Sequence, residues 1–288
     1  MNPQTPIPSD AELEAMCVEL ATGAARLVAD ARAGQDGITV DSKSTATDLV
    51  TDVDRRSEAW LLEQLTRLRP ADAVLAEEGA SHDGTSGVRW VLDPIDGTVN
   101  FVLGLPLYAV SVAVEVDGDV AAGAVCNPAS GELFQASRSG PARLDGAQLG
   151  ARRSVPLARA VIGTGFAYDP AMRERQMRVA APLLPRVGDL RRLGSAALDL
   201  CFVAAGRLDG YFEVGLNPWD YAAGGLIARR AGCVTSGLRG AAPGSRMYAA
   251  APADLAPELF GVLEALAADR VSSSPSAGPA SPSTDPPS

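Results

Sequence analysis

The sequence predicts an α+β fold built from layers of helices and sheets. Its first half carries helical patterns followed by strands that are joined by a tight turn, whereas its second half alternates helices with strands. Of the 288 residues 47% are hydrophobic, so the chain can bury a large core. Because each helix and sheet has an apolar face to cover, packing in one sandwich of alternating layers is the expected arrangement.

Two amphipathic helices are expected near the N-terminus. The first spans residues 10–33, where apolar side chains recur every three or four positions and Ser9 or Asp10 can cap the first turn. The second spans residues 52–68, with its leucines on one side. The polar segment 34–47 between them has the composition of a mobile loop.

Strands follow the second helix. Residues 109–116 and 120–126 are apolar runs on either side of Asp117-Gly118, which is a hairpin signal. Three shorter segments complete the strands expected in this half, at residues 73–76, 89–92 and 132–137. The first half is therefore predicted to be an antiparallel sheet with two helices.

The second half repeats a different pattern. Helices are expected at residues 171–184, 195–205, 218–231 and 253–268, with strands around Leu190 and at 210–214. We predict a single domain over residues 9–270, with the antiparallel half at about 9–150 and the alternating half at about 151–270. Residues 271–288 are mostly Ser, Pro, Ala and Gly, a composition that cannot form a core and predicts a disordered tail.

Composition excludes several classes of function. Lys and Arg number 25 against 35 Asp and Glu, a net charge of −10, and no basic stripe marks a surface for nucleic acid. One histidine, His82, cannot form a multi-histidine zinc site and argues against a histidine-based catalytic triad. Carboxylates are the abundant reactive groups, and they suit hard cations such as Mg²⁺.

The sequence also predicts a cytoplasmic protein. No stretch approaches the ~20 apolar residues that a membrane-spanning helix needs, and residues 1–10 lack the features of a signal peptide. The four cysteines, at positions 17, 126, 201 and 233, are scattered among apolar neighbours. We expect buried thiols in a reducing compartment rather than disulfides or a metal site.

The most informative motif follows the strand at 89–92. Asp93 and Asp96 stand three positions apart, Gly97 permits close approach of the backbone to a ligand, and Thr98 adds a hydroxyl group. If a helix begins here, its free N–H groups form an anion site beside the two carboxylates. Metal-assisted phosphoryl transfer needs both features. The same residue types also suit an ordinary turn between a strand and a helix.

Three further acidic segments have both functional and structural interpretations. Glu77 and Glu78 end the strand at 73–76, where they could complete a metal site or form a solvated loop. Asp220 opens the helix at 218–231, where it could be a ligand or a helix cap. The acidic segment 48–54 precedes another helix, with the same two interpretations.

In combination, these motifs resemble the inositol monophosphatase family of Mg²⁺-dependent sugar-phosphate phosphatases. The resemblance covers most of residues 10–266 and rests on residues 93–98 with Asn100-Phe101, Glu77-Glu78, residues 218–224, residues 48–51 with Asp54, and residues 194–199. It implies a layered α-β-α-β-α sandwich of the sugar phosphatase type, a homodimer and sensitivity to lithium. The net negative charge and the lack of a long apolar stretch separately predict no nucleic-acid and no membrane partner.

The resemblance also implies site residues. Two or three Mg²⁺ ions are expected on the side chains of Glu77, Asp93, Asp96 and Asp220 and on the carbonyl oxygen of Ile95. Glu77, Thr98 and Asp54 would be catalytic residues that orient and deprotonate the attacking water. Lys43 corresponds to a loop lysine near the active site.

Substrate binding is expected at positions that overlap this set. They are Ile95, Asp96, Gly97, Thr98, Arg191, Gly194, Ser195, Ala196, Glu213 and Asp220. Glu213 could accept hydrogen bonds from ring hydroxyl groups, and the small residues at 194–196 leave room for a polyol. Arg191 could pair with a carboxylate or phosphate or be structural.

The expected activity is therefore hydrolysis of myo-inositol 1-phosphate, or of a related polyol phosphate, by metal-activated water. Phosphatases for histidinol phosphate, fructose 1,6-bisphosphate and 3′-phosphoadenosine 5′-phosphate share the metal motif and remain alternatives. So does a regulatory binding protein with secondary catalysis, because a fold does not fix a function. Asn217 before Pro218, and the Gly- and Ala-rich segment 237–245, depart from the animal enzymes and leave the substrate open.

Overall fold

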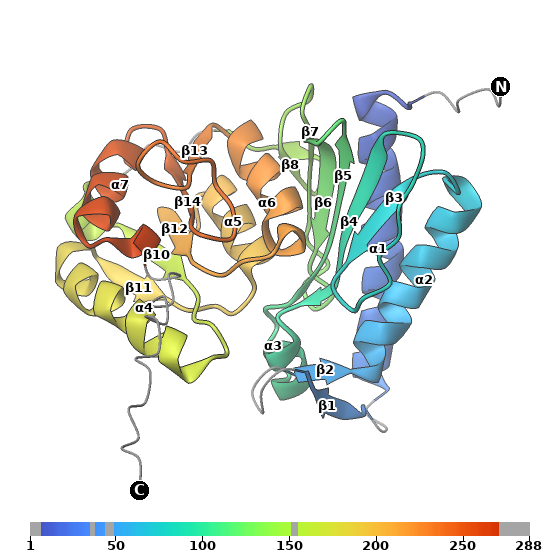
Figure 1. Ribbon diagram of the computed structural model, residues 1–288, viewed down its shortest axis with the longest axis horizontal. Coiled ribbons are helices and arrows are strands. Elements are labelled where there is room, and N and C mark those ends of the chain that lie inside the picture. The colour runs from blue at the N-terminus through green and yellow to red at the C-terminus, as the bar shows by residue number, and fades with distance from the viewer. Residues whose placement is uncertain (1–6, 35–37, 44–48, 151–154, 271–288) are drawn as a thin grey trace, which may run out of the picture.

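Two β-sheets alternate with three layers of helices in an α-β-α-β-α sandwich, which confirms the predicted fold class (Figure 1). The structure is a computed structural model that describes residues 7–34, 38–43, 49–150 and 155–270. The predicted tail at 271–288 lies outside the described residues. No helix in the described part of the chain combines the length and apolar composition that a bilayer crossing requires.

Helices α1 (Asp10–Ala33) and α2 (Asp52–Leu68) form one outer layer, as predicted (Figure 1). Both begin with capping boxes, in which the hydroxyl groups of Ser9 and Thr51 accept hydrogen bonds from backbone N–H groups. Their apolar faces pack on the first sheet in one hydrophobic cluster, which includes the fully buried Trp90. Burial of this face fixes the position of α2, whose first turn approaches the site described below.

The first sheet has seven strands in the order β3-β4-β5-β6-β7-β8-β9. Their bounds are Ala73–Ala76, Val88–Asp96, Ala109–Val116, Asp119–Cys126, Leu133–Ser137, Arg143–Leu144 and Ala147–Gln148. The predicted hairpin is confirmed, since Asp117 and Gly118 both adopt positive φ in the turn between β5 and β6. The sheet is not wholly antiparallel, however, because β3 pairs with β4 in parallel.

A second hairpin lies where the sequence predicted only a loop. Strand β1 (Val40–Ser42) pairs antiparallel with β2 (Leu49–Thr51) beside the N-terminus of α2. The side chains of β1 are all exposed, so hydrophobic alternation gives no signal for this strand. The pairing places Lys43, at the end of β1, close to the carboxyl end of β3.

The second sheet has five strands in the order β11-β10-β12-β14-β13. Their bounds are Asp189–Arg191, Val161–Thr164, Gly210–Glu213, Tyr248–Pro252 and Cys233–Ser236. Strand β10, next to the edge, pairs in parallel with both of its neighbours, whereas β14 is antiparallel to β12 and β13. The sequence did not predict β10, β13 or β14. Strand β14 is buried along its whole length and therefore lacks an alternating pattern.

Helices α5 (Ala196–Ala204) and α6 (Pro218–Arg230) lie between the two sheets (Figure 1). All nine residues of α5 are buried, because sheets or helices cover it on every side. Helices α4 (Pro170–Leu183) and α7 (Ala256–Ala265) cover the far face of the second sheet. Short elements complete the fold, namely α3 (Thr98–Leu103) and the 3₁₀ turns at Leu157–Arg159, Leu184–Arg186 and Ala268–Arg270.

The close packing of α6 on the first sheet generates a test of this layering. At Gly123 in β6, an added Cβ would lie 2.8 Å from the Cα atom of Ala223 in α6. We expect Gly123→Ala to lower the free energy of unfolding by about 1–3 kcal/mol, because it forces helix and sheet apart. Gly261→Ala in α7 is the matched control. An added Cβ there meets open space, so we expect equal or higher stability, by up to ~1 kcal/mol. Urea denaturation measures both, and equal stabilities of the two variants would contradict the packing.

Candidate active site

A cavity of about 350 Å³ opens where the two halves of the molecule meet. Its walls come from the end of β4, the first turns of α3, α5 and α6, and the ends of β10 and β12. Most of the predicted site residues line it, namely Lys43, Glu77, Asp93, Ile95, Asp96, Gly97, Thr98, Gly194, Ser195, Ala196, Glu213 and Asp220. Residues far apart in sequence thus share one cavity.

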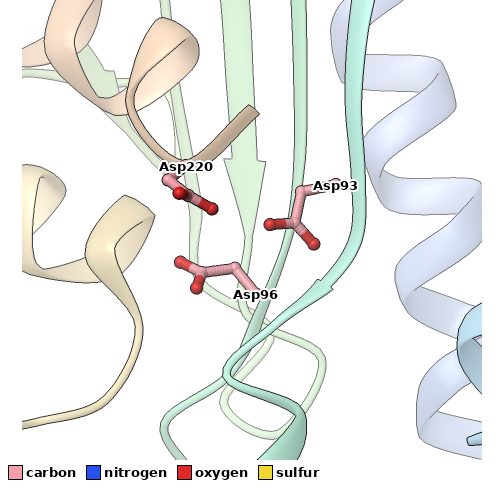
Figure 2. A group of neighbouring side chains, drawn as sticks. All are labelled: Asp93, Asp96 and Asp220. Atoms are coloured by element: carbon pink, nitrogen blue, oxygen red, sulfur yellow. The ribbon is translucent and has the colours of Figure 1, made fainter. Parts of the chain in front are cut away.

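Three carboxylates form the acidic centre of this cavity. Asp93, Asp96 and Asp220 each offer an oxygen atom, and these atoms lie within 4.8 Å of one another (Figure 2). The first two come from β4 and the third from the first turn of α6. Carboxylate oxygens at such separations suit a hard divalent cation.

A β-bulge brings the two β4 carboxylates to the same side. Asp93 pairs with Ser111 of β5, whereas Asp96 pairs with Ala109, so β4 has one residue more than its partner over this interval. Side chains three positions apart in a regular strand point to opposite faces, and one extra residue reverses this. Pro94, which lacks an N–H group for the ladder, lies in the bulge.

Burial and mutual repulsion disfavour the ionised forms of these carboxyl groups. The pKa of Asp93 is raised well above its ordinary value by burial, and then by the charges of Glu77, Asp96 and Asp220. Burial also raises the pKa of Asp220, and it raises that of Asp96 to about 6 despite hydrogen bonds from Ser195 and Ala197. A bound cation would relieve this repulsion.

Asp96 and Asp220 also have structural partners. The Oδ2 atom of Asp96 accepts hydrogen bonds from Ser195 Oγ at 2.6 Å and from the N–H group of Ala197 at 2.7 Å, which ties β4 to the first turn of α5. Asp220 Oδ2 accepts the N–H group of Asn217 at 2.6 Å, so the predicted capping contact is present. Asp220 can therefore cap α6 with one carboxylate oxygen while the other oxygen is available to a cation.

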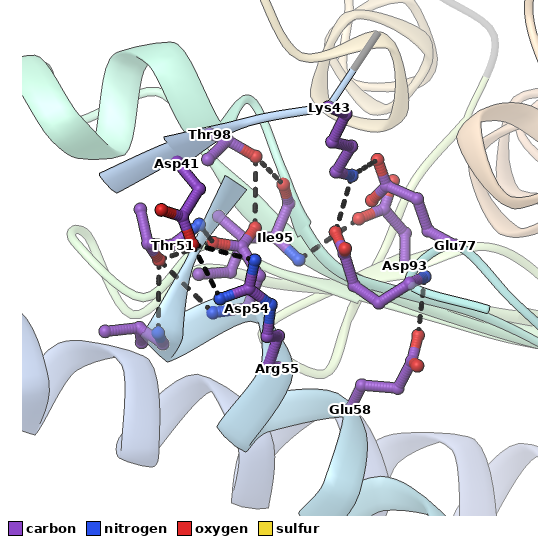
Figure 3. Close-up of polar contacts among 12 residues, drawn as sticks. Asp41, Lys43, Thr51, Asp54, Arg55, Glu58, Glu77, Asp93, Ile95 and Thr98 are labelled. Carbon is purple, nitrogen blue, oxygen red and sulfur yellow. Dashed lines mark hydrogen bonds and ion pairs between the residues drawn. The ribbon is translucent and has the colours of Figure 1, made fainter. Parts of the chain in front are cut away.

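Glu77 stands beside the three aspartates without a complete set of partners. Its Oε2 atom is buried and has no hydrogen-bond partner, whereas its Oε1 atom accepts the ammonium group of Lys43 at 2.8 Å (Figure 3). The same ammonium lies 2.5 Å from Glu78 Oε1. Burial lowers the pKa of Lys43, but the two carboxylates outweigh this effect and raise the pKa above its ordinary value. The ammonium group of Lys43 thus already supplies a positive charge beside Glu77.

A buried hydroxyl–carboxyl chain lies behind the cavity wall. The hydroxyl group of Thr98 is 3.1 Å from both Asp54 Oδ1 and the carbonyl oxygen of Ile95 (Figure 3). On its other side, Asp54 Oδ2 accepts the Thr51 hydroxyl group at 2.5 Å. Burial raises the pKa of Asp54 to about 6, against the hydrogen bonds from Thr51 that lower it. Thr98 lines the cavity, whereas Asp54 lies behind it and is connected to the cavity by its hydrogen bond with Thr98.

Gly97 makes the tight junction between the two halves possible. It adopts φ of 94° as the N-cap of α3, and an added Cβ would lie 3.1 Å from the carbonyl oxygens of Gly194 and Leu107. The amide of Asn100 donates hydrogen bonds to the carbonyl oxygens of Leu107 and Leu193, at 2.6 and 2.7 Å. These contacts hold the segment before α5 against the start of α3.

The structure does not bring Arg191 to the cavity. Its exposed guanidinium group pairs with Asp189 and donates to the carbonyl oxygen of Leu190. The next residue, Arg192, lines the cavity instead, because successive side chains at a strand end point to opposite sides. The sequence contains both arginines but no signal that distinguishes them.

Several cavity residues carried no sequence prediction of their own. Asp199 lines the cavity from α5, and residues 164–168, from the end of β10 onward, line it as well. Asp199 lies within a motif of the family resemblance, but nothing assigned it a role. The segment after β10 has no charged residue or recognisable motif, so only the fold could reveal it.

Comparisons with known proteins agree with this geometry. The family model described as "Inositol monophosphatase family" matches residues 9–271. "Inositol-1-monophosphatase SuhB" of Mycobacterium tuberculosis is 43% identical over 273 residues, covering 88% of this chain and 94% of that protein. "Nus factor SuhB" of Pasteurella multocida is 39% identical over 242 residues, covering 82% and 90%. The crystal structure of the extragenic suppressor protein suhB from Bartonella henselae, 33% identical, has a TM-score of 0.82 and covers 87% of this chain and 97% of that one.

The contact between Lys43 and Glu77 leads to a prediction about cation binding. A divalent cation on Glu77 must compete with the ammonium group, so Lys43→Met should raise the affinity for Mg²⁺ or Mn²⁺ about three- to tenfold, the equivalent of one partly buried ion pair of ~1 kcal/mol. Isothermal titration calorimetry of the substrate-free protein measures this affinity. Arg55→Met removes the exposed pair with Asp41 on the same hairpin and serves as the control. Unchanged or weaker cation binding in Lys43→Met would contradict the competition.

Proposed function

Because this chain belongs to the inositol monophosphatase family, we propose that it hydrolyses myo-inositol 1-phosphate, or a related polyol phosphate, to the free alcohol and phosphate. The family is one of metal-dependent phosphatases that act on small phosphorylated substrates. The observation that carries the proposal for this chain is the convergence of Asp93, Asp96 and Asp220 in one cavity, beside a glutamate oxygen that lacks a partner.

The donor set fits a hard cation. Every side-chain donor is a carboxylate, and Glu77 Oε2 is a buried oxygen atom without a hydrogen bond. The groups that would hold Mg²⁺, two or three ions in all, are the carboxylates of Glu77, Asp93, Asp96 and Asp220 with the carbonyl oxygen of Ile95. When bound, the cation lowers the pKa of water and neutralises negative charge on the phosphoryl oxygens.

Thr98 and Asp54 would accept and transfer the proton that the attacking water loses. Hydrolysis joins the water oxygen to phosphorus and breaks the bond between phosphorus and the alcohol oxygen, so one proton must leave the water and one must reach the departing alcohol oxygen. Thr98 faces the cavity and its hydroxyl group contacts Asp54, which can therefore receive a proton that is passed through Thr98. The contact of Asp54 with Thr51 holds this carboxyl group in place.

The backbone around Gly97 would hold the phosphate group. The N-cap residue of α3 is Gly97, which has no side chain to cap the first N–H groups, so these groups are available to an anion at the cavity wall. The alcohol would then extend toward the α5 side, past Gly194, Ser195 and Ala196, to Glu213. Arg192 replaces Arg191 in this proposal as the arginine that can reach the substrate.

A regulatory role is the second candidate function. It is favoured by the name "Nus factor SuhB" that several relatives carry, among them a protein of Salmonella typhimurium that is 40% identical over 201 residues. Such a role is compatible with phosphatase activity, because it would use a surface outside the cavity. A homodimer, a cytoplasmic location and the absence of a nucleic-acid partner stay predictions from the sequence.

A substrate panel tests the proposed activity. We expect phosphate release from myo-inositol 1-phosphate in the presence of Mg²⁺, and loss of that release in excess chelator, with restoration on adding Mg²⁺. Histidinol phosphate, fructose 1,6-bisphosphate and 3′-phosphoadenosine 5′-phosphate are assayed alongside by the same phosphate measurement. Faster turnover of any of these would replace the proposed substrate, and full activity in chelator would overturn the metal mechanism.

Asp96→Asn separates catalysis from a binding role. Asparagine keeps one acceptor oxygen for Ser195 and Ala197, but it replaces the remaining carboxylate oxygen with an NH₂ group that cannot bind a cation. We expect at least a ~100-fold loss of kcat, equivalent to about 2.7 kcal/mol, with the thermal unfolding midpoint in chelator close to the wild-type value. Asp119→Asn, at an exposed position, is the control. Retained turnover in Asp96→Asn would exclude the cluster from catalysis.

A further inference from the structure

Asp199 is a buried acid in the cavity wall without a full set of partners. Only 1% of the residue is exposed, and its Oδ1 atom has no hydrogen-bond partner. It projects from the first turn of α5, three positions after Ala196, and lines the cavity. Leaving a buried carboxyl oxygen unpaired is unfavourable, so a partner from outside the chain is expected at this position.

Glu213 is the neighbouring acid of Asp199. Burial, and then the charge of Glu213, raise the pKa of Asp199 well above its ordinary value, and burial raises the pKa of Glu213 to about 7. Glu213 packs flush against Gly165, where an added Cβ would lie 2.1 Å from its Oε1 atom. Its Oε2 atom accepts the hydroxyl group of Tyr211 at 2.5 Å, which fixes the orientation of the carboxyl group. This wall therefore presents two positioned carboxyl groups.

Arg192 already supplies positive charge to this wall. It lines the same cavity, and its charge lowers the pKa values of both Asp199 and Glu213, against the larger effect of burial. Because a guanidinium group is present, the two acids do not need a cationic ligand to balance them. The complementary ligand is an uncharged group that offers hydrogen bonds, and neighbouring hydroxyl groups of a polyol have this character.

We propose that Asp199 is a further specificity-determining residue, which hydrogen bonds a hydroxyl group of the alcohol portion beside the one already expected at Glu213. The inference rests on the proposed phosphatase function and deepens it. It makes the substrate a phosphate ester with at least two free hydroxyl groups on the side away from the phosphate. Esters without these groups leave Asp199 unpaired and bind less well.

Two variants of Asp199, each assayed on two esters, test this proposal. Asp199→Leu keeps the branched shape and the number of non-hydrogen atoms but has no hydrogen-bonding group, whereas Asp199→Asn keeps hydrogen bonding without the charge. For myo-inositol 1-phosphate we expect kcat/KM to fall about 10- to 100-fold in Asp199→Leu, chiefly through KM, and to stay within about fivefold in Asp199→Asn. For phenyl phosphate, whose alcohol portion has no further hydroxyl group, both variants should stay within about threefold of wild type.

Asp209→Leu is the matched control. The carboxylate of Asp209 accepts the N–H group of Val161 at 2.9 Å and does not line the cavity, so any loss in this variant should be equal for both esters. An equal loss for both esters in Asp199→Leu would show a structural role and overturn the proposal. So would an Asp199→Asn variant as impaired as Asp199→Leu on the polyol ester, because recognition would then depend on charge.

Binding of free myo-inositol separates this inference from the proposed function. If wild type hydrolyses neither ester, the phosphatase proposal fails. Ligand-observed NMR with myo-inositol still decides the role of Asp199. Saturation transfer that is strong in wild type and Asp199→Asn but lost in Asp199→Leu supports hydroxyl recognition, and equal transfer in all three overturns it.

Discussion

The electrostatic repulsion among buried carboxyl groups is the constraint on which the rest of this structure depends. Asp93, Asp96 and Asp220 converge within 4.8 Å, and Glu77 adds a buried oxygen atom without a partner. Such a cluster opposes folding unless protons or cations compensate it. In the substrate-free protein, Lys43 provides part of that compensation at Glu77. The same repulsion would be relieved by a bound divalent cation. The interaction that destabilises this part of the fold is therefore also the one on which the proposed function depends.

Hydrogen bonds beside the cavity join the two halves of the molecule and oppose this repulsion. The amide of Asn100 bridges the carbonyl oxygens of Leu107 and Leu193, and Asp96 binds the first turn of α5. Three hydrophobic clusters fill the interfaces between layers and hold these elements in register. The carboxylates are therefore fixed by rigid strands and helices rather than by a flexible loop, which is the condition for a preorganised site.

Much of the site could be predicted from sequence because its members carry distinctive local patterns. The run from Asp93 to Thr98 and the segment after Pro218 combine acids with turn and cap residues, and their order along the chain identified the family. Arg191 and Asp199 show where such reasoning ends. Two adjacent arginines have the same chemistry, and only the direction of the chain at the end of β11 decides that Arg192 faces the cavity. Asp199 lies in a helix pattern that serves packing equally well.

The sequence by itself determined the fold class, the helices α1 and α2 to the residue, the β5–β6 hairpin and the acids of the site, because periodicity, caps and turn residues act over a few positions. The tertiary structure alone decided the parallel pairing of β10 with β12, the antiparallel pairing of β14 with β12, the β4 bulge and the contact of Lys43 with Glu77. Strands buried on both faces show no alternation, and a bulge depends on the register of two strands. Contacts between residues distant in sequence depend on how whole layers pack, which no local pattern encodes.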